Sequence, residues 1–255
     1  MLRALLTGLR WRAWFGWALA LLPTLMLALP APAQAEDVDL RLVLAVDASG
    51  SVNESRFELQ KQGYVAAFRH PRVLRAIKSG ALGKIAVTMT QWTGPGMQVQ
   101  VVPWSVISNE HDAEAFSAAI EAAPRKLFAG GTSISGAIDH GVKVLGESPH
   151  IAARSVIDVS GDGGNNRGRP AASARDEAVA AGVVINGLPI LELDPTLDQH
   201  YLNNVIGGPN SFMVPAQRFT EFSDAVLKKL IIEIAGLPGS RIRVTKSASR
   251  ACLTC

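Results

Sequence analysis

Residues 40–51 read LRLVLAVDASGS, and this stretch decides the fold. Residues 40–46 are apolar apart from Arg41, which is typical of a parallel strand that is buried on both faces. The run ends in one carboxylate and two hydroxyls at alternate positions, Asp47, Ser49 and Ser51. In an open α/β sheet, ligands gather at the carboxyl ends of the strands. We therefore expect a site for a hard metal ion at this strand end, because such ions prefer oxygen donors.

Composition and charge bound the class of protein. The chain has 255 residues, of which 48% are hydrophobic, and this is enough for one sizeable core. Three of its basic residues precede the first acidic residue, Glu36: Arg3, Arg10 and Arg12. Without these three, the 25 basic residues become 22 and equal the 22 acidic ones. A neutral chain argues against a nucleic-acid-binding surface.

Residues 1–35 have the three parts of a secretory signal peptide. The basic residues are followed by an uncharged apolar run, residues 13–29, and then by the small-x-small sequence Ala33-Gln34-Ala35. We expect cleavage ahead of Glu36 and export to the periplasm or the cell exterior. The alternative is an uncleaved anchor, because the apolar run approaches the length that spans a bilayer. Membrane contact is expected only through this leader.

Strand and helix patterns alternate along the rest of the chain. Strand patterns follow the first one at residues 84–92, 97–103, 155–160, 183–189 and 211–214. Helical patterns lie at residues 53–68, 112–123, 134–145, 170–181, 197–205 and 219–235. The turn Thr93-Gly94-Pro95-Gly96 joins two strands as a hairpin, and Pro71 is expected to stop the first helix. This order predicts an α/β domain over residues 36–238 with a doubly wound, mostly parallel sheet, one antiparallel edge hairpin and helices on both faces.

Two further stretches place oxygen-bearing side chains near element ends. Thr132 follows two glycines and precedes a helix, where a plain helix cap is the alternative interpretation. Asp162 follows a second apolar strand and lies in a glycine-rich loop. Asp158 interrupts that strand. Because a buried carboxylate must be paired, we expect Asp158 to bond a neighbouring loop rather than to act in catalysis.

Three motifs, taken in this order, resemble the metal-ion-dependent adhesion site (MIDAS) of a von Willebrand factor type A (VWA) domain: Asp47-Ala48-Ser49-Gly50-Ser51, Gly130-Gly131-Thr132 and Ser160-Gly161-Asp162-Gly163. The likeness spans roughly residues 38–237. Residues 91–96, 159–170 and 204–209 also resemble a family of secreted bacterial VWA-like proteins that has no assigned activity. The resemblance therefore implies a fold and a metal site more firmly than a biological role.

The resemblance implies a divalent cation, Mg²⁺ or in its place Mn²⁺ or Ca²⁺. It assigns five residues to the site: Asp47, Ser49, Ser51, Thr132 and Asp162. The three hydroxyls would bind the ion directly, and the two carboxylates would act nearby, often through water. A position left open on the ion could accept a carboxylate from another protein, so the implied partner is a protein that presents an acidic side chain.

Departures from the family pattern also bear on the site. Gly161 stands where many such domains have Thr or Ser, so that one hydroxyl is missing or is replaced by Ser160. Arg167 and Arg169 follow Asp162 closely and would favour an acidic ligand, although loop arginines of this kind are more often simply solvated.

The sequence favours a binding protein over an enzyme. A metal-dependent phosphoester hydrolase is the alternative, because Asp47-x-Ser-x-Ser resembles a phosphotransferase loop, but Ser49 stands where those enzymes usually carry a second carboxylate. A structural subunit with a vestigial metal site is a third reading. The sequence contains no Gly-x-Ser-x-Gly elbow, phosphate-binding loop or His-Glu-x-x-His helix, and its histidines are scattered.

The C-terminal part contains a helix and a basic tail. The helical pattern at residues 219–235 has an apolar stripe, and we expect Lys228, Lys229 and Glu233 on its solvated side. The resemblance implies that this helix can slide when the metal site changes its ligands. The tail, residues 239–255, ends in Cys252-x-x-Cys255. The role of these cysteines stays open, but a redox enzyme is not expected because no helix follows the first cysteine.

Overall fold

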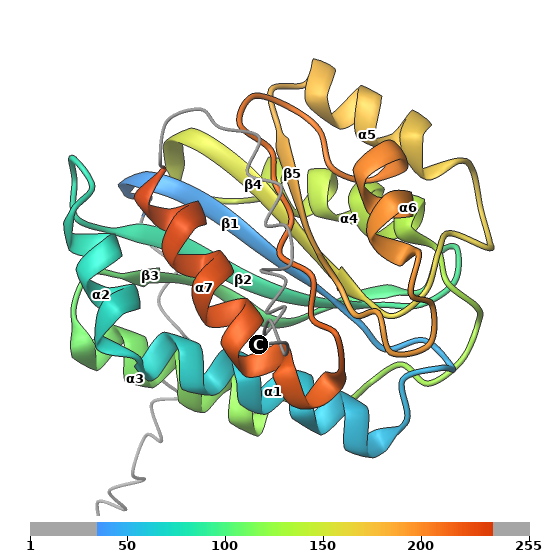
Figure 1. The fold of residues 1–255 in the computed structure, drawn as a ribbon. Coiled ribbons are helices and arrows are strands. Elements are labelled where there is room, and N and C mark those ends of the chain that lie inside the picture. The colour runs from blue at the N-terminus through green and yellow to red at the C-terminus, as the bar shows by residue number, and fades with distance from the viewer. Residues whose placement is uncertain (1–34, 237–255) are drawn as a thin grey trace, which may run out of the picture. The chain divides into compact units, whose positions relative to one another are not determined.

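A computed structural model describes residues 35–236. Its sheet has five strands in the order β3-β2-β1-β4-β5 (Figure 1). All neighbouring strands pair in parallel except β2 and β3, which pair antiparallel at one edge. The strands are β1 (Asp37–Asp47), β2 (Ile85–Trp92), β3 (Gln98–Ile107), β4 (Ile151–Gly161) and β5 (Val184–Pro189). The predicted fold class is confirmed. The predicted leader and basic tail, with Cys252 and Cys255, lie outside the described residues apart from Ala35.

Helices cover both faces of the sheet (Figure 1). One face carries α1 (Glu54–Arg69), α2 (Pro71–Lys78), α3 (Glu110–Ala122) and α7 (Phe222–Ala235), the last preceded by the short 3₁₀ helix η1 (Phe219–Glu221). The other face carries α4 (Ile134–Gly146), α5 (Ala171–Ala180) and α6 (Leu197–Asn204). The sheet is therefore the middle layer of three.

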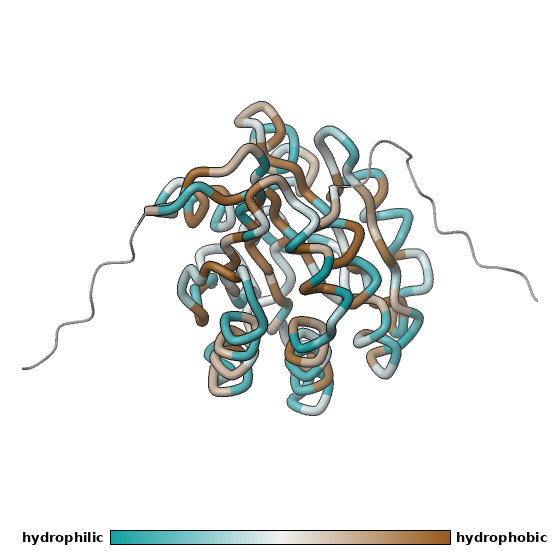
Figure 2. The backbone as a smooth tube through the Cα atoms, turned by 90° about the vertical axis from the view of Figure 1, so that its left-hand side faces the viewer, coloured by the Kyte–Doolittle hydropathy of each residue, from teal (hydrophilic) through white to brown (hydrophobic). Residues whose placement is uncertain are grey.

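The central strand β1 explains why its sequence is almost continuously apolar. Leu42 and Leu44 pack in the core against α1, α3 and α7, whereas Val43 and Ala45 belong to the core beneath α4, α5 and α6. Alternate side chains of a strand point to opposite faces, so a strand with helices on both sides is apolar along most of its length. Figure 2 shows hydrophobic segments running through the interior, while the outer helices alternate between hydrophilic and hydrophobic turns.

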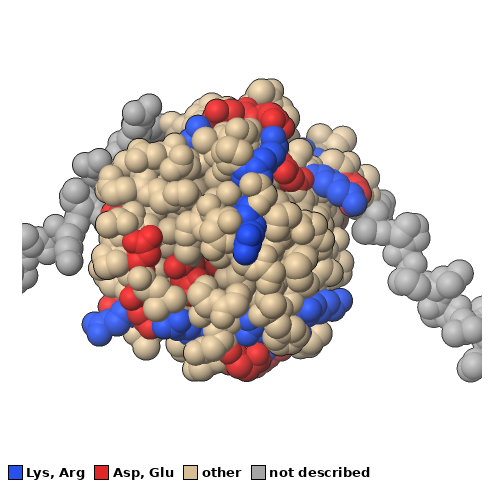
Figure 3. Space-filling view, turned by 90° about the vertical axis from the view of Figure 1, so that its right-hand side faces the viewer, with Lys and Arg blue, Asp and Glu red and all other residues tan. Residues whose placement is uncertain are grey.

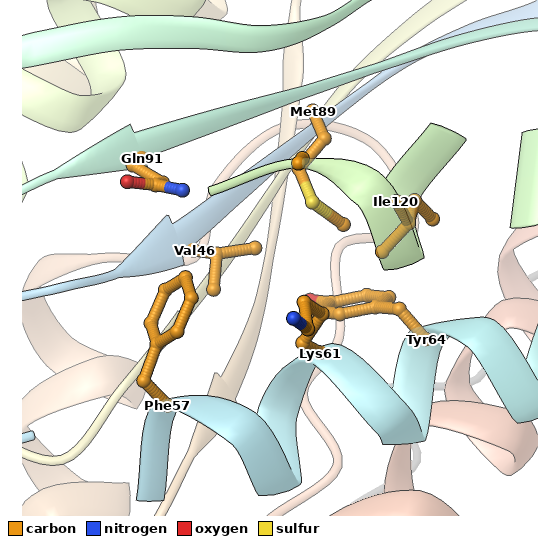
Figure 4. A pocket seen from close by; sticks show the side chains of 8 residues that line it. Val46, Phe57, Lys61, Tyr64, Met89, Gln91 and Ile120 are labelled. Carbon is orange, nitrogen blue, oxygen red and sulfur yellow. The ribbon is translucent and has the colours of Figure 1, made fainter. Parts of the chain in front are cut away.

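A small cavity of about 10 Å³ lies between α1 and the sheet (Figure 4). Its walls include Val46, Phe57 and Met89, with the polar groups of Lys61 and Gln91 at its margin. A space of this size holds at most about one water molecule. The layer between α1 and the sheet is therefore closely packed.

The helix end before Pro71 was predicted correctly, but the helix that begins at Pro71 was missed, and the strand predicted at residues 211–214 was wrong. Pro71 does follow the end of α1, but it also begins a second helix, α2, in which His70 Nδ1 accepts a hydrogen bond of 3.1 Å from the Arg72 amide. Proline suits the first position of a helix because its missing N–H has no partner there in any case. The strand expected at residues 211–214 is reduced to an isolated bridge between Met213 and Gly187.

The prediction for the last helix was wrong at two positions. The prediction placed Lys229 and Glu233 on the solvated side of α7. In the structure both side chains are buried between the helix and the sheet. The helical pattern marks them as polar, but it cannot show that Asp158, on the distant strand β4, lies opposite Lys229 and pairs with it. Among residues 35–236, no helix combines the length and the apolar character that crossing a bilayer requires.

Candidate metal-binding site

The loop that follows β1 is turned by its own side chains. Asp47 Oδ1 accepts a hydrogen bond of 2.7 Å from the Ser49 amide, which is a local turn that aspartate readily forms. The hydroxyls of Ser49 and Ser51 lie 3.2 Å apart. Asp47 and Ser49 are buried, and Ser51 is exposed. The Asp-x-Ser-x-Ser motif thus forms a compact oxygen cluster at the carboxyl end of the central strand.

Asp162 joins this cluster from the neighbouring strand. The Ser51 hydroxyl donates a hydrogen bond of 2.6 Å to Asp162 Oδ1, and the Asp162 amide approaches Asp47 Oδ2 at 3.4 Å. The contact exists because β1 and β4 are paired in parallel with Val46 opposite Ser160, so that both strands end at the same level. From β1 the chain goes on to β2 and β3 on one side of the sheet, and it returns to β4 and β5 on the other. Ligands in open α/β sheets bind at such a point.

Thr132 lies beside the same cluster. Its loop is shaped by Gly130 and Gly131, whose φ angles of 114° and 82° are costly for residues with a side chain. The Thr132 amide donates to Asn166 Oδ1 at 2.9 Å, and the Thr132 carbonyl accepts from the Asn166 amide at 2.9 Å. A Cβ placed on Gly163 would lie 3.6 Å from Thr132 Oγ1. The structure therefore brings four predicted residues into one hydrogen-bond network and sets Thr132 next to it.

Within residues 35–236 neither carboxylate forms a salt bridge, although the charge of Arg56 acts on Asp162 from a distance. Burial, with the neighbouring charge of Asp162, raises the pKa of Asp47 to about 7. Burial also raises the pKa of Asp162, whose Oδ2 atom is buried and has no hydrogen-bond partner in the described part of the chain. Two like charges held together away from water destabilise the fold unless a cation or a proton compensates them.

The donor set fits a hard divalent cation. Three hydroxyls and two carboxylates offer oxygen alone, which suits Mg²⁺ or Mn²⁺ and does not suit a metal that prefers nitrogen or sulfur. Within residues 35–236 no group of three or more His, Cys, Asp or Glu side chains could hold a metal ion. A metal at this site would therefore depend on the hydroxyls of Ser49, Ser51 and Thr132.

Sequence analysis missed Arg125, which holds the loop after β1 in place. Its guanidinium donates hydrogen bonds to three loop carbonyls, those of Ala48 at 3.1 Å, Ser49 at 3.4 Å and Val52 at 2.6 Å. The side chain is only 6% exposed, and it lies against the ring of Phe57 at 5.2 Å. Its acceptors precede it by 73 to 77 residues, so nothing in the local sequence marks its role.

Two more side chains support the cluster from α1. Gln60 Nε2 donates a hydrogen bond of 3.1 Å to the Asp47 carbonyl. Arg56 donates to the Ser51 carbonyl at 3.0 Å and pairs with Glu192 at 2.9 Å. The helix that follows the motif thus anchors the same loop from a second side.

The two arginines near Asp162 differ in what they can do. Arg169 is engaged by Asp139 and Glu177, whose carboxylates neutralise it, so it is not free to attract an acidic ligand. Arg167 is exposed, and a Cβ on Gly131 would meet its Cγ at 2.6 Å. Arg167 therefore lies against the Thr132 loop.

The order of the strands and the helices on both faces define an α/β fold of the VWA-like and Rossmann-like kind. The chain belongs to the family described as "Protein of unknown function (DUF1194)", whose model matches residues 37–238. No curated protein matches it.

Several solved structures share the fold. Proximal thread matrix protein 1 from the mussel byssus, "with zinc occupied MIDAS motif", has a TM-score of 0.58 and 17% identity over 80% of this chain and 49% of its own. The pilus adhesin SpaC from Lactobacillus rhamnosus GG has a TM-score of 0.56 and 16% identity over 78% of this chain and 30% of its own. BatB from Bacteroides thetaiotaomicron has a TM-score of 0.51 and 17% identity over 78% of this chain and 100% of its own. At these identities the likeness shows the fold alone, and this chain spans only about half of the mussel protein.

Replacing Arg125 by methionine should destabilise the protein by about 2 to 4 kcal/mol, because three partly buried carbonyls lose their charged donor. The free energy of unfolding in urea measures this effect. Arg72→Met is the matched control: Arg72 is exposed, and its replacement should change the stability by less than about 0.5 kcal/mol. Equal effects of the two substitutions would show that Arg125 does not hold the loop.

Proposed function

We propose that this protein binds one divalent cation, Mg²⁺ or Mn²⁺, and uses it to recognise an acidic side chain of a protein ligand. The observation that carries the proposal is the pair of buried carboxylates, Asp47 and Asp162, which meet at the ends of adjacent strands and form no salt bridge with any of residues 35–236. Ser49, Ser51 and Thr132 supply the neutral oxygens. Neutral ligands leave a bound cation with charge to share, and a carboxylate from outside can use it.

The surface around the site suits a protein ligand. Three apolar side chains near it are exposed: Phe128 at 60%, Leu193 at 51% and Met97 at 38%. Phe128 lies 4.9 Å from the Arg125 guanidinium, and the Met97 sulfur lies near Gly130. The β1–α1 loop lies at the right of Figure 1, and Figure 3 views that side, where most of the surface belongs to uncharged residues. Apolar side chains around a polar centre are common in protein interfaces.

Two proteins of similar structure support an adhesive role that involves a metal ion. One is a thread matrix protein whose MIDAS motif holds zinc, and another is a pilus adhesin. Export through a leader at residues 1–35 belongs to the same proposal, because an adhesive domain acts outside the cytoplasm.

The positions of Asp47 and His200 support a binding protein rather than the alternative, a metal-dependent hydrolase. A nucleophilic aspartate needs an oxygen that can reach a substrate, but Asp47 is fully buried and its Oδ1 is held by the Ser49 amide. His200, the histidine near the Asp162 loop, accepts a hydrogen bond from the Asn165 amide at 3.3 Å. The Nε2 atom of His200 is therefore used in holding the loop and is not free to act as a general base.

Mg²⁺ should stabilise the protein, because it compensates two buried carboxylates that exist only in the folded state. At a concentration one hundred times its dissociation constant, the gain should be about 2.7 kcal/mol, measured by thermal or urea unfolding. Asp162→Asn should abolish the gain and should leave the metal-free protein at least as stable as before, since one uncompensated buried charge is gone. Asp176→Asn, at an exposed position, should retain the full gain. A gain of equal size in Asp162→Asn would place the ion elsewhere.

Capture of partners from the native cell envelope tests the proposed recognition. The full chain, immobilised in Mg²⁺, should retain a partner that a chelator releases and that Asp162→Asn fails to retain. The same partners on the chelated protein and on the variant would mean that the site is vestigial and that the domain acts as a scaffold. Turnover of a generic phosphoester that is lost in Asp162→Asn would instead favour the hydrolase.

A further inference from the structure

A second group of charged side chains lies in the core, apart from the metal site. Lys229 and Asp158 are 0% exposed and Glu233 is 2% exposed, although such residues are seldom fully buried. Lys229 and Glu233 stand one turn apart on α7, and Asp158 lies on β4. The cluster therefore joins the last helix to the middle of the sheet.

Lys229 contacts both carboxylates of the cluster, but the two carboxylates differ in their hydrogen bonds. Lys229 Nζ lies 2.7 Å from Asp158 Oδ1, yet neither carboxyl oxygen of Asp158 accepts a hydrogen bond of ordinary geometry from the described residues. Glu233 Oε1 accepts from Lys229 Nζ at 3.2 Å and from Asn186 Nδ2 at 2.7 Å. The amine is thus held against the carboxyl group of Asp158 by a second carboxylate that lies beside both.

The surroundings exclude water. The ring of Phe212 lies 5.4 Å from Lys229 Nζ. Tyr64 is fully buried on the same face of the sheet, and its hydroxyl donates a hydrogen bond of 3.3 Å to Ser160 Oγ. Arg154 faces the end of α7, but it donates to the backbone carbonyls of Glu233 and Ile234. Two carboxylates therefore share one lysine, and a net negative charge would remain in the core if all three were ionised.

We propose that Lys229 and Asp158 are joined by an amide bond between their side chains, formed within the folded chain with Glu233 as the proton carrier. This inference is independent of the proposed metal site. It names a modification site in the core, and the reactants are two side chains of the same molecule.

The reaction balances without any other reactant. The lone pair of the neutral Lys229 amine attacks Cγ of the protonated Asp158 carboxyl group, and the new Nζ–Cγ bond forms. Glu233 takes a proton from Nζ and returns it to the leaving hydroxyl, so that the Cγ–O bond breaks and one water molecule departs. An amine and a carboxylic acid become a secondary amide, and Glu233 ends in the state in which it began.

The environment favours the neutral reactants. Burial raises the pKa of Asp158, so that its protonated form becomes accessible. Moving a proton from the Lys229 ammonium to Asp158 removes two charges from a medium that solvates them poorly. A neutral amide also ends the desolvation cost of the buried ion pair, and the low water content of the core opposes hydrolysis.

The bond would change what α7 can do. It would tie the helix covalently to β4, four residues ahead of Asp162, and would prevent the sliding that resemblance to VWA domains implied for this helix. A covalent link between distant residues also restricts the unfolded chain, as a disulfide does. Such a link suits a domain that carries load.

Peptide mapping by mass spectrometry tests the proposal on the full chain after reduction. Trypsin should release a branched peptide in which residues 155–167 are joined to residues 229–241, lighter by one water than the sum of the two. Cleavage after Lys229 should be blocked, whereas cleavage after Lys228 should proceed. An intact mass alone does not suffice, because the Asp162-Gly163 sequence can also lose water. Linear peptides only, with cleavage after Lys229, would overturn the proposal.

Two variants separate the roles of the residues. Lys229→Arg keeps the positive charge but should yield no branched peptide. Glu233→Gln keeps an acceptor for Lys229 and Asn186 but cannot carry the proton, so the yield of branched peptide should fall at least tenfold while circular dichroism stays that of the folded protein. A full yield in Glu233→Gln would overturn the assignment of Glu233 as proton carrier.

Discussion

Asp47 and Asp162 meet because β1 and β4 are hydrogen-bonded neighbours that run in parallel and end at the same level. Parallel pairing sends every strand end toward the same edge, and the reversal of strand order leaves room there for loops from both sides. The cost is that two carboxylates are brought together in a poorly solvated place. The pair is stable only when a proton or a cation compensates its charge, and the proposed metal binding rests on this constraint.

The loops around these carboxylates are held by cationic and amide groups rather than by regular structure. Arg125 binds three carbonyls of the loop after β1, and Gln60 binds a fourth, that of Asp47. The Arg125 guanidinium binds backbone carbonyls and pairs with Glu54, and it forms no salt bridge with Asp47 or Asp162. The site is thus preorganised while its negative charge stays available.

β4 carries buried acids at two levels. Asp162 lies in the loop at its end, while Asp158 lies within the strand and faces Lys229 of α7. Ile157 and Val159, on either side of Asp158, belong to the core on the other face of the sheet. One strand therefore serves the metal site with its end and the anchoring of the last helix with its middle.

Sequence reasoning could predict the layers because both of their signals are local. The apolar run at residues 40–46 and the 3.6-residue stripes of the helices follow from burial alone, and the order of motifs placed Asp47 and Asp162 at strand ends. The prediction failed where the cause lies far away in the chain. From sequence alone Lys229 resembles a solvated residue of an amphipathic helix, because its partner Asp158 lies far away in the chain. Arg125 likewise resembles an ordinary loop arginine, because the carbonyls that it binds lie more than 70 residues earlier. The strand predicted at residues 211–214 does not form, because only one bridge to β5 occurs there.

The most direct test of a cation at this strand edge is an anomalous diffraction map from crystals grown with Mn²⁺. The account predicts one strong peak within coordination reach of the Ser49, Ser51 and Thr132 hydroxyls, and the absence of a peak there, or a peak only at another place, would contradict it.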